Sequence, residues 1–134
     1  MTVVGDQEGD EFLRAVLVVD DEPAVRETAC ELFRSFGLCC YDAYNAEDAL
    51  RLLSAHPEIG LLFADVRMPG MDGAALAREA QRLRPDLKVV LTSGWVDNAG
   101  IGDFPLVQKP LGMGVIAGLM RTAGIRPRQP AGQF

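Results

Sequence analysis

The stretch AVLVVDDEP (15–23) decides the fold of this chain. Its first five residues form a continuous apolar run rich in β-branched side chains, the pattern of a strand buried on both faces of a parallel sheet. Two acids end the run, and a proline follows at a position that the first turn of a helix tolerates. Apolar residues then recur at helical spacing from Val25 to Phe36, and Gly37 supplies a stop. The stretch therefore predicts a strand leading directly into a helix.

The same alternation continues to the end of the chain. Further strands are predicted at 38–43, 59–64, 88–92 and 106–108, and further helices at 46–55, 74–83 and 113–122. Strands that alternate with helices at this spacing form right-handed βαβ units and a doubly wound α/β fold with a five-stranded parallel sheet. We divide the chain into a polar lead-in (1–14), one domain (15–122) and a flexible tail (123–134), since 134 residues suit a single core.

Composition excludes several classes of function. The net charge of −6, with scattered basic residues, argues against nucleic-acid binding, which needs clustered Lys and Arg. No apolar run approaches the roughly 20 residues that span a membrane, so no membrane partner is expected. The acidic N-terminus lacks the features of a secretory signal, and we expect a cytoplasmic protein.

The three cysteines, Cys30, Cys39 and Cys40, form neither a CxxC pair nor an even set. Cys39 and Cys40 are adjacent in a predicted strand, so their side chains should point to opposite faces. We expect free thiols with no metal-binding or redox role.

Charged residues gather where the predicted strands end. Asp20 and Asp21 close the first strand, Asp65 closes LLFAD (61–65), and Lys109 closes PLVQK (105–109). Ligands of doubly wound sheets bind outside the carboxyl ends of the strands, where Thr92 also falls. Three carboxylates this close would hold a proton or a cation, and Mg²⁺ suits carboxylates combined with phosphate oxygens. The set predicts a phosphate-handling site.

Four motifs in order, LVVDDEP (17–23), ADVRMPGMDG (64–73), LTSG (91–94) and QKP (108–110), resemble the receiver domain of two-component response regulators. The resemblance covers about residues 15–122. It implies a flavodoxin-like, three-layer αβα fold with strand order 2-1-3-4-5, and a phosphorelay protein that is not itself an enzyme.

The resemblance also implies a role for each site residue. Asp65 would accept a phosphoryl group from a histidine kinase or a histidine phosphotransfer protein. Asp21, Asp65 and the backbone carbonyl of Arg67 would ligate Mg²⁺ directly, and Asp20 would act through water. Lys109 and Thr92 would each contact a phosphoryl oxygen, and the Lys109-Pro110 bond would be cis.

Two departures from the family pattern affect the regions that usually pass the signal of a receiver on to its target. Thr92 and Lys109 are only 17 residues apart (109 − 92), which is shorter than usual, so the fourth helix is expected to be shortened or absent. The position three residues before the lysine, usually aromatic, is Leu106, and neither Trp95 nor Phe104 replaces it by position.

The leading hypothesis is a stand-alone receiver that signals to an unknown protein target through protein–protein contacts. An excised receiver of a hybrid histidine kinase is an alternative, because T-S-G-W (92–95) looks more like receivers of that class. An aspartate-nucleophile phosphatase is a third, since Glu22 lies two residues after Asp20, but the turn MPGMDG (68–73) has no part in that scheme.

Overall fold

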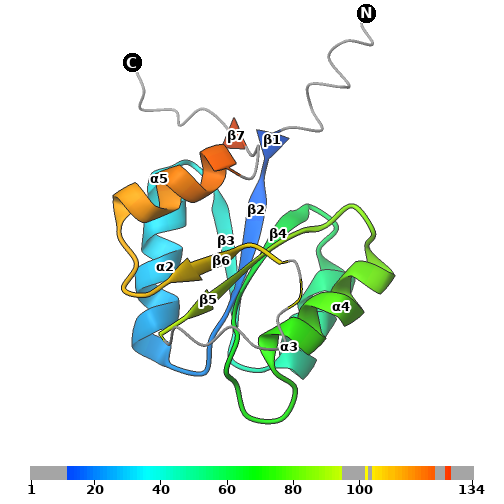
Figure 1. Ribbon diagram of the computed structural model, residues 1–134. Helices are drawn as coiled ribbons and strands as arrows, with labels where there is room; N and C mark the ends of the chain where they lie inside the picture. Colours follow the sequence, from blue (N-terminus) through cyan, green and yellow to red (C-terminus); the bar gives the residue numbers. More distant parts are fainter. Residues whose placement is uncertain (1–11, 95–101, 103, 123–125, 128–134) are drawn as a thin grey trace, which may run out of the picture.

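The computed structural model describes residues 12–94, 102, 104–122 and 126–127 (Figure 1). The helices are α2 (Pro23–Ser35), α3 (Ala46–Ala55), α4 (Gly73–Leu83) and α5 (Met113–Thr122). The main strands are β2 (Ala15–Val19), β3 (Cys39–Ala43), β4 (Ile59–Asp65), β5 (Lys88–Ser93) and β6 (Leu106–Gln108), and two short strands are β1 (Phe12–Leu13) and β7 (Arg126–Pro127). Every predicted strand and helix is present, with bounds that differ by at most two residues.

The five main strands form one parallel sheet in the order β3-β2-β4-β5-β6. Counted along the chain, this is the predicted order 2-1-3-4-5. Strands β2 and β4 lie in the interior of the sheet, and almost all of their residues are buried. Their continuous apolar sequences follow from helices that cover both faces.

In the described part of the chain, helices cover both faces of the sheet (Figure 1). Helices α2 and α5 bury their apolar sides against one face around Phe33, whose ring packs edge-on to Phe63 with centroids 5.1 Å apart. Helices α3 and α4 cover the other face with small residues and leucines, including Leu53 and Leu76. The three-layer αβα arrangement is confirmed.

Local signals set the helix ends. The side chains of Asn45 and Asp72 accept hydrogen bonds from backbone N–H groups three residues on, at 2.7 and 2.8 Å, and so cap α3 and α4. Gly37 has a φ of 86°, the left-handed conformation that favours glycine after a helix.

The predicted shortening of the fourth helix concerns the segment between β5 and β6. Residues 95–101 and 103 lie outside the described part of the chain, so this prediction is not tested. Leu106 and Phe104 are half-buried against the core on the α3/α4 side. Trp95 falls among the residues that are not described.

The prediction of three free thiols is wrong for two of the cysteines. Cys30 on α2 and Cys40 on β3 form a disulfide, with Cα atoms 5.5 Å apart, and Cys39 is free and exposed. The adjacent cysteines do point to different environments, and this brings Cys40 alone to the face that α2 covers. An odd number of cysteines does not exclude one intramolecular disulfide.

Two short strands join the first and last described segments of the chain. Strands β1 and β7 pair in parallel, with Phe12 opposite Arg126 and Leu13 opposite Pro127. Most of the predicted lead-in and tail lies outside the described residues, so the division of the chain stays a prediction. Within the described chain, no helix has both the length and the apolar character needed to cross a membrane.

Candidate functional site

The carboxyl ends of four strands bring the predicted residues together. Asp20 follows β2, Asp65 is the last residue of β4, and Lys109 follows β6. Thr92 lies on β5 directly opposite Asp65 in the strand register. The carboxyl ends of parallel strands meet at one edge of the sheet, so these four residues converge on one site although they are spread over positions 20 to 109 of the sequence.

Three carboxylates and one ammonium group form the centre of the site. One carboxylate oxygen from each of Asp20, Asp21 and Asp65 lies within 4.8 Å of the other two. Lys109 Nζ donates to Asp20 Oδ2 at 3.0 Å and to Asp65 Oδ2 at 3.3 Å. Asp20 and Asp65 are buried whereas Asp21 is exposed, so the cluster opens to solvent on the Asp21 side.

Burial dominates the electrostatics of Asp65. It raises the pKa of the Asp65 carboxyl, and the charge of Asp20 raises it further, while Lys109 and the Arg67 backbone N–H oppose both effects. Burial of the Lys109 ammonium lowers its pKa, but the hydrogen bond to Asp20 and the charges of Asp65 and Asp20 outweigh that effect, so the pKa is raised overall. One lysine therefore leaves the negative charge of the cluster incompletely balanced.

A dense set of contacts fixes Asp20. Its Oδ1 accepts from the backbone N–H of Glu22 at 2.9 Å, and its own N–H donates to the Ala43 carbonyl at 3.2 Å. Its carbonyl accepts from Arg26 Nη1 at 2.8 Å, and Arg26 Nε also pairs with Asp42 Oδ2 at 3.2 Å. The backbone at the end of β2 is thus tied to both α2 and β3.

The turn after Asp65 returns close to its own start. The backbone N–H of Arg67 donates to Asp65 Oδ1 at 3.3 Å, and that of Gly73 donates to the Val66 carbonyl at 2.9 Å. A Cβ atom on Gly73 would collide with the Asp65 carbonyl oxygen. Glycine is therefore required at the start of α4 for Asp65 to hold its place.

We expect Gly73→Ala to destabilise the protein by about 1–3 kcal/mol, because backbone atoms at the end of β4 would have to move. Chemical denaturation of the variant measures this loss. Gly114→Ala is the matched control, since a Cβ there meets nothing within 4 Å and alanine favours the helix. Equal stabilities of the two variants would contradict the close approach at Gly73.

Thr92 is buried at the edge of the site. The residue is 2% exposed, and its carbonyl accepts a hydrogen bond from the Val66 N–H at 2.8 Å, which fixes the turn after Asp65 to β5. The neighbouring Ser93 is buried too. Lys109 precedes a cis peptide bond to Pro110, as the resemblance implied.

The cluster fits a divalent cation that prefers oxygen ligands. Three carboxylates lie within reach of one ion, and burial and then the charge of Asp20 raise the pKa of Asp65, two effects that a bound cation would offset. The receiver domains that the sequence resembles bind Mg²⁺ at an acidic pocket of this kind. Asp20, Asp21 and Asp65 are the side chains that would hold the ion here.

Sequence reasoning missed two residues that shape the site. Arg26 is a polar position between apolar residues of a predicted helix, and no local pattern shows that it reaches back to Asp20. The sequence shows Gly73 only as the last residue of the turn MPGMDG (68–73). Its position directly after an N-cap aspartate, in a turn that leaves a buried strand, is a signal that could have indicated a close approach.

Comparisons with known proteins agree with the geometry. The family model of the response regulator receiver domain matches residues 16–114. Sensor kinase CckA of Brucella abortus (strain 2308) is 34% identical over 91 residues, which are 67% of this chain and 10% of CckA. The chain also spans 18% of the transport regulator DctD of Rhizobium meliloti (strain 1021).

Two solved structures are similar over most of their length. A response regulator receiver protein from Pseudomonas putida is 29% identical, with a TM-score of 0.72 over 81% of this chain and 96% of that one. The receiver domain of the hybrid histidine kinase CckA is 30% identical, with a TM-score of 0.70 over 81% of this chain and 97% of that one. Because the family model matches well over half of the sequence, the chain belongs to the response regulator receiver domain family.

Proposed function

We propose that the chain is a phosphorelay receiver whose Asp65 accepts a phosphoryl group from a histidine kinase or a histidine phosphotransfer protein. The observation that carries this proposal is the contact of one Asp65 oxygen with Lys109 Nζ, beside two further aspartates at the same sheet edge. Receiver domains are signalling modules, and phosphorylation on aspartate is typical of the family. We place the reaction in the cytoplasm.

The transfer itself needs little besides position and charge. An Asp65 oxygen forms a bond to phosphorus as the phosphorus–nitrogen bond of the donor's phosphohistidine breaks, and the leaving imidazole takes up a proton. Lys109 is proposed to neutralise charge on one phosphoryl oxygen, and the Thr92 hydroxyl is proposed to donate a hydrogen bond to another. Mg²⁺, when bound, would neutralise the remaining charge of the transferring oxygens.

The Mg²⁺ ligands are part of the same proposal. Asp21 and Asp65 are proposed to bind Mg²⁺ directly, together with the carbonyl of Arg67. Asp20, which Lys109 and the Glu22 N–H already contact, is proposed to act through water. The response is expected to pass through protein–protein contacts, and the stand-alone arrangement stays a prediction that the size of the native protein would test.

Intact-mass spectrometry after incubation with acetyl phosphate tests the proposal. We expect a single phosphoryl adduct that requires Mg²⁺ and that peptide mapping places on Asp65. An adduct on another residue, or one that forms equally well with a chelator present, would contradict the proposed site.

A groove beside the site suits a phosphodonor protein. It has a volume of about 310 Å³ and is bordered by Ala24, Val25, Thr28, Lys109, Pro110 and Leu111. The first three residues lie on α2, and Lys109 belongs to the site itself. A protein that brings a phosphohistidine to Asp65 would have to cover this edge, so we propose that the donor contacts the groove.

We expect Thr28→Arg to slow phosphotransfer from the cognate donor by about 10-fold or more, because a large charged side chain would fill the groove, and an anchor lost from an interface costs about 1–2 kcal/mol. Phosphorylation by acetyl phosphate should not change, since that small donor needs no docking surface. Glu27→Arg, which changes charge more but lies outside the groove, is the control. Slower reaction with both donors would show damage to the site instead.

A further inference from the structure

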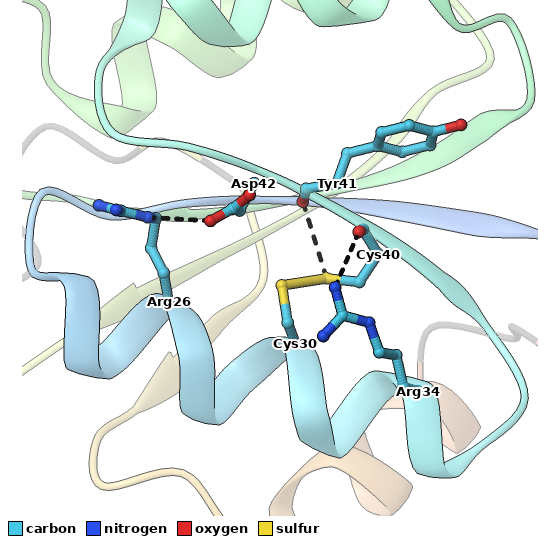
Figure 2. Close-up of a disulfide and its surroundings, with 6 residues drawn as sticks. All are labelled: Arg26, Cys30, Arg34, Cys40, Tyr41 and Asp42. Atoms are coloured by element: carbon cyan, nitrogen blue, oxygen red, sulfur yellow. Dashed lines mark hydrogen bonds and ion pairs between the residues drawn. A yellow bond between two sulfur atoms is a disulfide. The ribbon is translucent and has the colours of Figure 1, made fainter.

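Three contacts join helix α2 to strand β3 along one line (Figure 2). Arg26 Nε pairs with Asp42 Oδ2 at 3.2 Å, Cys30 is bonded to Cys40, and an Arg34 guanidinium N–H donates to the Cys40 carbonyl at 3.4 Å. The helical members are four residues apart, so they lie on the same side of α2, one turn from each other. Three successive contacts therefore hold helix α2 against strand β3.

The first two of these contacts match in spacing. Four residues of helix advance about 6 Å, and two residues of strand advance about 6.6 Å. The step from Arg26 to Cys30 along the helix thus matches the step from Asp42 to Cys40 along β3, which runs in the opposite direction to the helix. A restraint between Cys30 and Cys40 consequently limits how far Arg26 can move relative to Asp42.

The Arg26 contact leads directly to the phosphoacceptor site. Arg26 Nη1 donates to the Asp20 carbonyl at 2.8 Å, and the Asp20 N–H donates to the carbonyl of Ala43, the residue after Asp42. The Asp20 carboxylate in turn contacts Lys109. Arg26 is a positioning residue for Asp20, and the cysteine pair lies one helical turn behind it.

The cysteines are suited to reversible oxidation. Their Cα separation of 5.5 Å lies in the usual range for disulfides. Cys30 is buried and Cys40 is half-buried, so Cys40 is the more accessible sulfur. Lasting disulfides are rare in the cytoplasm, where a disulfide is usually transient or redox-sensing. This step rests on the proposed function and its cytoplasmic setting.

We propose that Cys30 and Cys40 form a redox modification site, which low-molecular-weight disulfides oxidise and thiols reduce, and that closing it raises the Mg²⁺ affinity of the Asp20 cluster. The Cys40 thiolate attacks the small disulfide, forming a mixed disulfide and releasing one small thiol. The Cys30 thiolate then attacks the Cys40 sulfur and releases the second. Two electrons and two protons pass from the cysteines to the small thiols.

Thiol trapping tests the redox step without any phosphorylation. The full chain is equilibrated in buffers of oxidised and reduced glutathione, alkylated, and mapped by mass spectrometry. We expect a Cys30–Cys40 linkage in oxidising buffer that is lost in reducing buffer, with Cys39 alkylated in both. Cys39→Ser should behave like the wild type, and Cys40→Ser should form no internal linkage. A linkage through Cys39, no linkage at any ratio, or one that native protein never loses would overturn the proposal.

Calorimetric titration with Mg²⁺ tests the coupling to the site. We expect the oxidised protein to bind Mg²⁺ at least about fivefold more tightly than the reduced protein, the lower end of typical coupling between sites. Arg26→Gln should remove this difference while leaving the thiol chemistry intact. Asp42→Asn, at an exposed position, should reduce it as well and guards against a folding defect in the first variant. Equal affinities of the oxidised and reduced wild type would overturn the coupling.

A failure of the proposed function would look different from a failure of this inference. A chain that takes no phosphoryl group from any donor, yet cycles between dithiol and disulfide with a change in Mg²⁺ affinity, would refute only the receiver activity. A chain that is phosphorylated normally, with cysteines that never pair, would refute only the redox site.

Discussion

Asp65→Asn is expected to take up no measurable phosphoryl group from acetyl phosphate or from a protein donor. The amide keeps the size of the carboxylate but lacks its nucleophilic oxygen, and removing a nucleophile in covalent catalysis can cost on the order of 10⁶ in rate. Intact-mass spectrometry under the conditions that phosphorylate the wild type measures the loss. Asp86→Asn, in the exposed turn before β5, is the control and should be phosphorylated normally. A phosphoryl adduct on Asp65→Asn would place the acceptor elsewhere.

The same variant separates chemistry from stability. The raised pKa of Asp65 means that the folded protein binds its proton more tightly than the unfolded chain does. Without metal, stability should therefore fall as the pH rises from the ordinary pKa of an aspartate through the raised value. Asp65→Asn lacks this loss, so above that range it should melt at a higher temperature than the wild type in a chelating buffer. A lower melting temperature would contradict the unbalanced charge of the cluster.

Lys109→Met should have opposite effects on metal binding and on phosphotransfer. Methionine fills similar space but removes the charge that contacts Asp20 and Asp65 at 3.0 and 3.3 Å. The more negative cluster should bind Mg²⁺ more tightly. Phosphotransfer should nevertheless slow by about 10²–10³-fold, the usual cost of losing one group that stabilises developing charge.

Mg²⁺ titration and phosphorylation kinetics measure the two effects of Lys109→Met independently. The control is Lys88→Met, since Lys88 is the only other lysine of the chain and lies exposed at the start of β5. Weaker binding of Mg²⁺ together with slower transfer would indicate a collapsed site. Unchanged transfer would remove Lys109 from the proposed mechanism.

The sheet and the centre of the site could be predicted because their signals are local. Asp65 closes a run of buried apolar residues, and such a run predicts a strand whose end faces the ligand side of the sheet. Asp20 and Lys109 follow the same rule at other strands. What each of these side chains does in the reaction stays a prediction, drawn from the family and from their contacts.

Features that depend on the relative placement of two elements could not be predicted. The Cys30–Cys40 pairing requires the rotation of α2 and the face of β3 to be known together, and sequence alone does not give the pairing of cysteines. Arg26 reaches Asp20 for the same reason, across a helix turn and a strand end. The close approach of Gly73 to Asp65 is a property of the folded turn.

Strands as short as β1 and β7 give no usable pattern either. Two residues cannot show the alternation that identifies a strand, and proline in β7 argues against one. The parallel pairing of Phe12 with Arg126 is visible only once the intervening domain has brought the two segments together.

That pairing also predicts the order in which parts of the domain unfold locally. Phe12 and Arg126 are 114 positions apart (126 − 12), so their contact encloses almost the whole domain, although each of the two strands has only two residues. A link of this kind forms only after the chain between its ends has condensed, because closing a long loop is unfavourable until other contacts compensate. It should also be the first to separate in native-state hydrogen exchange, while the amides of β2 and β4 exchange only when the whole domain unfolds. Residues 12–13 and 126–127 would thus form a peripheral cooperative unit, whose opening leaves the acidic cluster at the opposite ends of the strands undisturbed.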